Sequence, residues 1–122
     1  MKEIVFDSSA WIEYFSGSVE GKRVKEIIAS DDVIYTPSIC LAEIKGKYIK
    51  EGKEYKDRIS FIFSRSKSVN ITGDIALITG NKKNEWNLHM VDALIYATSI
   101  FIGAPLLTKD NHFKNLEKVQ ML

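Results

Sequence analysis

The sequence predicts one α/β domain over residues 1–122, a three-layer αβα sandwich whose parallel, twisted sheet has helices on both faces. Two observations predict this fold class. Short β-branched and apolar runs alternate with longer amphipathic stretches, and such alternation favours parallel strands joined by right-handed helical crossovers. The composition is 45% hydrophobic and 27% charged, which is typical of a globular chain with a buried core.

The first half of the chain begins with the apolar run Glu3–Phe6, which is typical of a strand buried on both faces. Asp7 and the serines after it favour a helix N-cap. Thr36 is expected to cap a later helix that begins at Pro37, because proline suits the first helical position. We expect helices at Ala10–Phe15, Val19–Ser30, Pro37–Lys50 and Glu54–Ser64, and a second strand at Val33–Tyr35.

The second half continues the alternation of strands and helices. Asp74 is expected to cap a helix over Ile75–Trp86. A strongly apolar helix follows and ends at the Gly-Ala-Pro sequence that begins at Gly103, which breaks helices. We expect a third strand at Val69–Ile71, this helix at Val91–Ile102, a strand at Pro105–Thr108, a loop at Lys109–His112 and a last strand at Lys118–Met121.

Bulk properties exclude several classes of protein. The net charge is +1, so any nucleic-acid contact requires a local basic patch. Cys40 is the only cysteine, which excludes a disulfide framework and a cysteine-rich zinc site. The segment Met90–Leu107 is interrupted by Asp92, so no apolar run is long enough to span a membrane. The N-terminus becomes acidic too early for a signal peptide. We therefore expect a cytoplasmic protein.

Four acidic residues lie where the expected strands end. Asp7 directly follows the first strand, and Asp110 lies two residues beyond the strand Pro105–Thr108. Glu43 and Asp92 lie early in helices that begin at the same edge of the sheet, each within an apolar run. Ligands of parallel sheets bind outside the carboxyl ends of the strands, where the strand order reverses. We therefore expect the four carboxylates to meet in one pocket.

Four carboxylates in one pocket predict a bound divalent cation, because close carboxylates repel and raise one another's pKa values. Oxygen ligands without cysteine favour Mg²⁺ or Mn²⁺. Such an ion lowers the pKa of a bound water and neutralises charge on a phosphodiester oxygen, so we expect metal-assisted phosphodiester hydrolysis. Thr108, Ser8 and Ser9 are placed to hydrogen-bond the ligands. Asn in place of Asp7 or Asp92 should leave the metal-free fold intact or more stable, because repulsion is lost.

Each acid also has a structural interpretation. Asp7 can be an N-cap, Asp92 a first-turn acid favoured by the helix dipole, and Asp110 part of a turn. Glu43 is harder to explain in this way, because glutamate neither caps helices nor forms turns and is rarely buried without a partner. The placement of all four at one edge favours the functional interpretation.

Other features near these acids are less specific. His89 and His112 flank the expected site, but its oxygen-rich character favours surface or capping roles for both. The basic stretch Lys45–Lys67 is interleaved with acids, so it is either a solvated helix face or a surface that attracts phosphate. The aromatic residues of Ala10–Phe15 favour an exposed patch for a partner, because so short a helix cannot bury all its faces.

At these residues the chain resembles the PIN-domain family and, by its size, the VapC-type toxin ribonucleases. The third of four matching motifs is the most specific, and the match covers essentially the whole chain in the right order. The motifs are Val5–Ile12, Thr36–Ile44, Val91–Thr98 and Leu106–Phe113.

This resemblance implies a PIN-like αβα fold that cleaves RNA with Mg²⁺ or Mn²⁺. It also implies the toxin of a type II toxin–antitoxin pair, a small antitoxin protein as partner and a homodimer. Many relatives have a further acid where this chain has His112, a departure that bears on a second metal site but not on the first. Carried over residue by residue, the catalytic and metal site comprises Asp7, Glu43, Asp92 and Asp110, supported by Thr108.

Competing classes fit the sequence less well. A receiver-type signalling domain needs paired acids after the first strand, where Asp7 stands alone. A haloacid-dehalogenase-like phosphatase needs a second acid where Ser9 stands. Within the resemblance, a housekeeping RNA-processing nuclease and a non-catalytic RNA- or protein-binding module remain as alternatives. The acidic set argues against the non-catalytic module, and the short chain favours a toxin over a processing enzyme.

Overall fold

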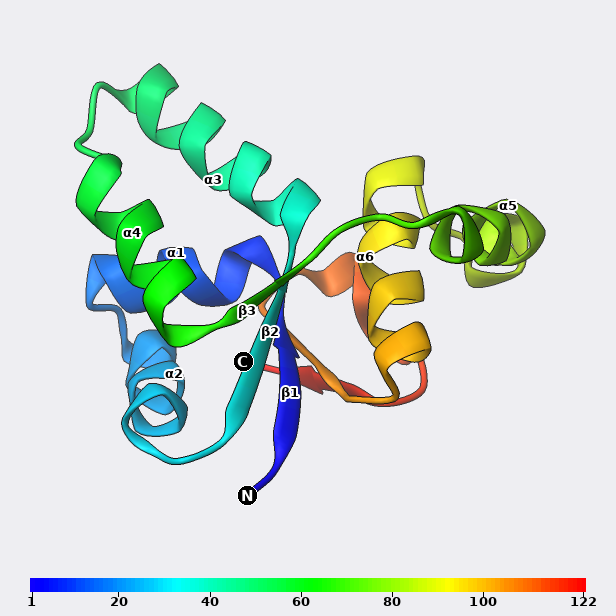
Figure 1. Ribbon diagram of the computed structural model, residues 1–122, viewed down its shortest axis with the longest axis horizontal. Helices are drawn as coiled ribbons and strands as arrows, with labels where there is room; N and C mark the ends of the chain where they lie inside the picture. Colours follow the sequence, from blue (N-terminus) through cyan, green and yellow to red (C-terminus); the bar gives the residue numbers. More distant parts are fainter.

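The computed structural model describes residues 1–122 and contains a five-stranded sheet in which every neighbouring pair is parallel (Figure 1). The strands are β1 (Glu3–Phe6), β2 (Val33–Pro37), β3 (Lys67–Val69), β4 (Leu106–Thr108) and β5 (Val119–Met121). Their order is β3-β2-β1-β4-β5. The chain extends from central β1 to one side through β2 and β3, then returns to the other side at β4. The strand order therefore reverses between β1 and β4, where ligands of such sheets bind.

Six helices cover the sheet in two layers, so the predicted αβα sandwich is confirmed. They are α1 (Ser8–Ser16), α2 (Val19–Ala29), α3 (Ser38–Glu51), α4 (Lys56–Arg65), α5 (Gly73–Trp86) and α6 (Met90–Ile102). Figure 1 shows α1 to α4 on one side of the sheet and α5 and α6 on the other. None of the helices combines the length and the apolar character needed to cross a membrane.

Alternation along β1 explains the two layers. Ile4 and Phe6 belong to a core cluster with residues of α1 to α4, whereas Val5 belongs to a second cluster with Ala93 and Ile95 of α6. Successive side chains of a strand point to opposite faces, so this fully apolar strand supplies both cores. The short strand thereby fixes the position of the residue that follows it.

The helix α1 packs into the larger core and is not a solvent-exposed patch. Trp11 is fully buried, with its ring centroid 5.0 Å from that of Phe6, and its indole Nε1 donates to Thr36 Oγ1 at 3.0 Å. The expected aromatic patch for a partner is therefore wrong for Trp11, because α2 and α4 pack beside α1. Gly21 permits the close approach of α2, since a Cβ there would overlap the carbonyl oxygen of Glu13.

Several expected boundaries are wrong for identifiable reasons. Thr36 lies within β2 and does not cap α3, because its hydroxyl contacts Trp11 and lies 2.8 Å from Ser66 Oγ. Helix α5 is capped by Thr72, whose hydroxyl accepts from the Ile75 N–H at 3.3 Å, and Asp74 lies in its first turn.

Strand β3 is Lys67–Val69 and precedes the expected Val69–Ile71. Its polar sequence suits the exposed edge of the sheet and lacks the apolar pattern of a buried strand.

Candidate metal centre

Asp7 is a buried carboxylate held by neutral donors. It follows β1 directly, caps α1 and is 3% exposed. Its Oδ1 accepts from the backbone N–H of Ser8 at 2.7 Å, and its Oδ2 accepts from the hydroxyls of Ser9 and Thr108, each at 2.8 Å. These bonds satisfy and orient the carboxylate oxygens, but none of them neutralises the negative charge.

Thr108 connects the ends of β1 and β4. Its hydroxyl donates to Asp7 and accepts from the backbone N–H of Asp110 at 2.9 Å. The hydroxyl of Ser9 bridges in the same way, because it accepts from the backbone N–H of Lys109 at 2.9 Å. Two hydroxyls thus join the loop after β4 to the carboxylate after β1. Thr108 therefore hydrogen-bonds one of the expected site acids directly and the backbone of another.

Glu43 lies on α3 beside Asp7. The hydroxyl of Ser8 lies 2.9 Å from Glu43 Oε1 and 3.2 Å from Asp7 Oδ1, so its single proton can serve only one carboxylate at a time. Contrary to its apolar sequence context, Glu43 is an exposed residue, because only the side of α3 that carries Cys40, Ile44 and Tyr48 is buried. Partial burial of its carboxylate raises the pKa of Glu43, the Ser8 hydrogen bond lowers it, and the charges of Asp7, Asp92 and Asp110 raise it further.

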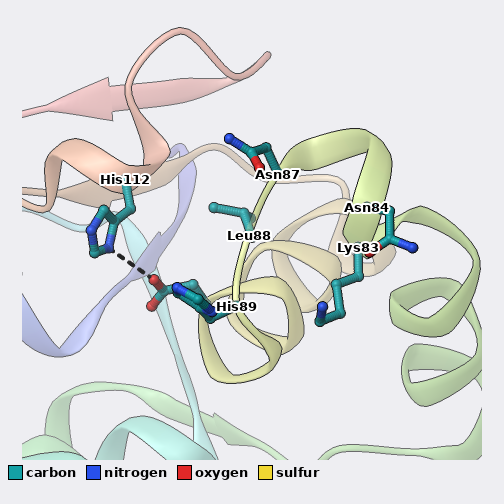
Figure 2. Close-up of a pocket in the computed structure, with 7 residues that line it drawn as sticks. Lys83, Asn84, Asn87, Leu88, His89 and His112 are labelled. Atoms are coloured by element: carbon teal, nitrogen blue, oxygen red, sulfur yellow. Dashed lines mark hydrogen bonds and ion pairs between the residues drawn. The ribbon is translucent and has the colours of Figure 1, made fainter.

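Asp92 and Asp110 meet across the gap between α6 and the loop after β4. Asp92 lies in the first turn of α6, and Asp110 caps the short 3₁₀ helix Asn111–Phe113 by accepting from the His112 N–H at 2.9 Å. The imidazole Nδ1 of His112 lies 3.2 Å from Asp92 Oδ2, the contact marked by the dashed line in Figure 2. It lies 3.3 Å from Asp110 Oδ1. Burial raises the pKa of Asp92, the charge of Asp110 adds to this effect, and His112 opposes it.

The structure places all four expected acids at the carboxyl edge of the sheet, in two adjoining groups. One ligand atom from each of Asp92, Asp110 and His112 lies within 4.8 Å of the others, and the same holds for Asp7, Glu43 and Cys40. The groups interact, because the charge of Asp7 raises the pKa of Asp92. We call Asp7, Glu43, Asp92 and Asp110 together the acidic pocket.

No lysine or arginine forms an ion pair with any member of the acidic pocket. Lys109 is next to Asp110 in sequence, but its ammonium pairs with Glu13 at 2.9 Å. His112 is the only basic side chain within ion-pair distance of the acids. Because carboxylates crowded without a cation are unfavourable, the arrangement favours binding of a positive ion.

The chemistry of the donors fits a hard divalent cation. Burial raises the pKa of the Cys40 thiol well above its ordinary value, and the charges of Asp7 and Glu43 raise it further. The thiol is therefore protonated at neutral pH and is a poor ligand for a metal. The remaining donors are carboxylate oxygens and one imidazole, a set that suits Mg²⁺ or Mn²⁺ better than softer ions.

Sequence reasoning did not anticipate the contacts of His112. The residue is exposed, as expected, yet its ring faces two of the acids. The sequence feature that could have predicted this contact is the two-residue spacing of Asp110 and His112. A capping carboxylate accepts the N–H two residues later, which brings the two side chains onto one short turn. His89, the other histidine, is exposed at the N-cap position of α6 without a capping hydrogen bond.

Much of the basic stretch Lys45–Lys67 serves the fold. The Arg65 guanidinium donates to the backbone carbonyls of Ile27, Ile28, Ser30 and Asp32. Lys47 and Lys53 both pair with Glu51. These groups are engaged within the chain, which favours the interpretation of the stretch as a structural and solvated surface.

Comparisons with known proteins agree with this architecture. The model of the PIN domain family matches residues 4–119. A toxin-antitoxin complex from Klebsiella pneumoniae contains a chain of similar structure, with a TM-score of 0.79, 27% sequence identity, and coverage of 97% of this chain and 96% of that chain. No curated protein matches the sequence.

Two further solved structures are similar at lower identity. VapBC2 from Rickettsia felis, bound to a DNA fragment from its promoter, has a TM-score of 0.77 and 16% identity, with coverage of 98% of this chain and 97% of that chain. Mycobacterium tuberculosis VapC20, a toxin that cleaves the sarcin-ricin loop, has a TM-score of 0.72 and 18% identity, with coverage of 95% and 96%. At such identities the similarity shows the fold. Because the family model matches nearly the whole length, the chain belongs to the PIN domain family.

Proposed function

We propose that this protein is a metal-dependent endoribonuclease that acts as the toxin of a type II toxin–antitoxin pair. The main support for this proposal is the acidic pocket, which lies where the strand order reverses. Its carboxylates lie close together without a lysine or arginine partner. Membership of the PIN family, a family of nucleases, supports hydrolysis of a phosphodiester bond. The similarity to VapC20 supports RNA as the substrate.

We assign Asp7, Asp92 and Asp110 as ligands of Mg²⁺ or Mn²⁺. Such an ion supplies a bound water of lowered pKa and neutralises charge on the phosphodiester. Ser9 and Thr108 hold the Asp7 carboxylate in one orientation through their hydroxyl groups. In a metal site, hydrogen bonds of this kind keep the ligand oxygens directed at the ion.

We assign Glu43 as a ligand through water or as the group that orients the nucleophile. Its pKa is raised by partial burial and by the neighbouring acids, which brings it closer to neutral pH. A carboxylate with a raised pKa is a better proton acceptor, so Glu43 Oε1 can take a proton from an attacking water. Ser8 limits this effect, because its hydrogen bond to Oε1 lowers the pKa.

The comparisons support an antitoxin as the partner. The Klebsiella pneumoniae chain of similar structure comes from a toxin-antitoxin complex, and the two chains cover each other almost completely. We propose that a small antitoxin protein likewise binds this chain, that the chain forms a homodimer, and that it acts in the cytoplasm, where RNA is available. A small reading frame directly upstream that encodes an inhibitory binding partner would distinguish a toxin from a housekeeping nuclease.

The test is cleavage of a mixed cellular RNA pool with Mg²⁺ or Mn²⁺, compared with EDTA and with Asp92→Asn. A matched control is Asp74→Asn, because Asp74 is likewise a first-turn acid but belongs to α5 and lies outside the pocket. We expect cleavage by the wild type and by Asp74→Asn, and none in EDTA or by Asp92→Asn. Cleavage that persists in EDTA, or equally in Asp92→Asn, would contradict the proposal.

A further inference from the structure

A cavity of about 380 Å³ adjoins the acidic pocket at the corner between α5 and α6 (Figure 2). It shares Asp92 and His112 with the acidic site, and its other polar walls are Lys83, Asn84, Asn87 and His89. We call this cavity the corner pocket. Figure 2 shows that Lys83 and Asn84 come from the end of α5, and Asn87 and His89 from the turn before α6.

Apart from Asp92 and His112, which contact each other, the polar side chains of the corner pocket are not engaged within the chain. The Lys83 ammonium forms no ion pair, whereas the adjacent Lys82 lies 3.2 Å from Glu85. His89 occupies the N-cap position of α6 but makes no capping hydrogen bond. The side-chain amides of Asn84 and Asn87 likewise form no hydrogen bond with another residue. The cavity therefore offers an ammonium, two amides and an imidazole to a ligand.

The chemistry of these groups fits one nucleotide of a single-stranded RNA. An ammonium attracts a backbone phosphate, and asparagine amides offer both the donors and the acceptors that base edges require. The volume of about 380 Å³ is at the small end of ligand pockets, which run from roughly 300 to 1,000 Å³. Because Asp92 is common to both sites, the cavity is placed to receive the nucleotide next to a phosphate that lies at the acids.

We propose that the corner pocket binds the nucleotide next to the bond that is cut, with Lys83 on its phosphate and Asn84 and Asn87 on its base edge. This inference rests on the proposed ribonuclease function and deepens it, because it names residues that set affinity and sequence preference. Lys83 supplies a positive charge for the phosphate of that nucleotide.

The first test compares Lys83→Met with Lys82→Met, two lysines on consecutive positions of α5. The probe is a fluorescein-labelled, mixed-sequence single-stranded RNA 12-mer, and binding is measured by anisotropy in EDTA at several salt concentrations. Loss of one phosphate contact should raise the Kd of Lys83→Met about five- to tenfold and reduce the salt slope by about 0.7. Lys82→Met should bind like the wild type within about twofold, because its exposed ion pair contributes little.

The second test removes the two amides while keeping the backbone. Asn87 has φ of 56°, a left-handed conformation that glycine adopts without strain, so the variant is Asn84→Ala with Asn87→Gly. We expect this variant to cut the RNA pool with a relaxed nucleotide preference beside the cleaved bond, as mapped by sequencing of fragment ends. An unchanged preference would overturn the assignment of the amides.

The outcomes separate this inference from the proposed function. If the wild type cleaves RNA with Mn²⁺ but Lys83→Met and Lys82→Met bind the probe equally, the corner pocket is not a nucleotide site, although the ribonuclease proposal stands. If the wild type neither binds the probe nor cleaves the pool, both proposals are wrong.

Discussion

Asp7 and Asp92 lie in the same acidic pocket but are held in opposite ways. Asp7 is 3% exposed and accepts hydrogen bonds from Ser8, Ser9 and Thr108. The Asp92 side chain is 18% exposed, and its one partner is the imidazole of His112. Burial raises the pKa of Asp92, so its charge is unfavourable in the metal-free fold. The Asp7 carboxylate is therefore held by the fold, whereas the Asp92 carboxylate lacks comparable hydrogen bonds.

The largest expected effect is on activity, and it should be the same for both acids, because both are proposed to bind the same ion. Asp7→Asn and Asp92→Asn should each lower the rate of RNA cleavage by more than about a hundredfold, beyond the effect typical of groups that only orient ligands. The measurement is the initial rate on the RNA pool with Mn²⁺, with Asp74→Asn as control. Near wild-type cleavage by either variant would show that its carboxylate is structural only.

A smaller loss of activity should follow from the group that orients Asp7. Thr108→Val removes the hydroxyl that donates to Asp7 and accepts from the Asp110 N–H, so cleavage should fall about 10- to 100-fold. Thr108→Ser keeps the hydroxyl and should restore most of the rate. If the Val and Ser variants cleave equally well, the hydroxyl has no part in the chemistry.

Asp7→Asn and Asp92→Asn should differ in their free energy of unfolding, although both should lose activity. Asn at position 7 presents an NH₂ group to donors, so metal-free Asp7→Asn should unfold with about 1–3 kcal/mol less free energy than the wild type. This revises the expectation from repulsion alone. Asp92→Asn loses an unfavourable charge and should be as stable or more stable. Urea denaturation in EDTA measures both values, and a strongly destabilised Asp92→Asn would mark Asp92 as structural.

The pH dependence of stability is the smallest effect and has a defined sign. The folded pKa of Asp92 is raised above its ordinary value of 3.8, so the folded state binds the proton more tightly than the unfolded state. The stabilisation that protonated Asp92 gives the folded state is therefore fully present below pH 3.8 and is lost as the pH rises through the folded pKa. The free energy of unfolding of the wild type and of Asp92→Asn is measured by denaturation from about pH 3 to 7. The decline with rising pH that Asp92 causes in the wild type should be absent from the variant, so the variant's curve should fall less. Parallel curves would contradict an unfavourable Asp92 charge.

The sequence was sufficient for features that depend on local pattern. The bounds of β1 follow from its apolar run, and its position fixes Asp7 at the carboxyl edge. In the same way, the apolar run of β4 fixes the position of Asp110, two residues beyond its end. The predicted convergence of the acids therefore needed only the strand ends and the starts of two helices.

Other features could not be predicted, because they depend on contacts between distant segments. Thr36 looks like a helix cap, but the Trp11 indole engages its hydroxyl across 25 positions of sequence. Glu43 lies in an apolar run yet is exposed, because the run packs only one side of α3. The approach of His112 to Asp92 depends on the packing of α6 and β4 into the same core cluster. Tertiary packing decided each of these cases.

The central claim is that Asp92 and its neighbours hold a divalent cation, and a calorimetric titration of Mn²⁺ tests it most directly. Wild type, Asp92→Asn and the control Asp74→Asn are titrated under the same conditions, without RNA. We expect saturable binding by the wild type and by Asp74→Asn, and binding weakened at least about tenfold by Asp92→Asn. Equal binding by all three proteins, or no binding by the wild type, would contradict the claim and leave the acidic pocket a structural feature.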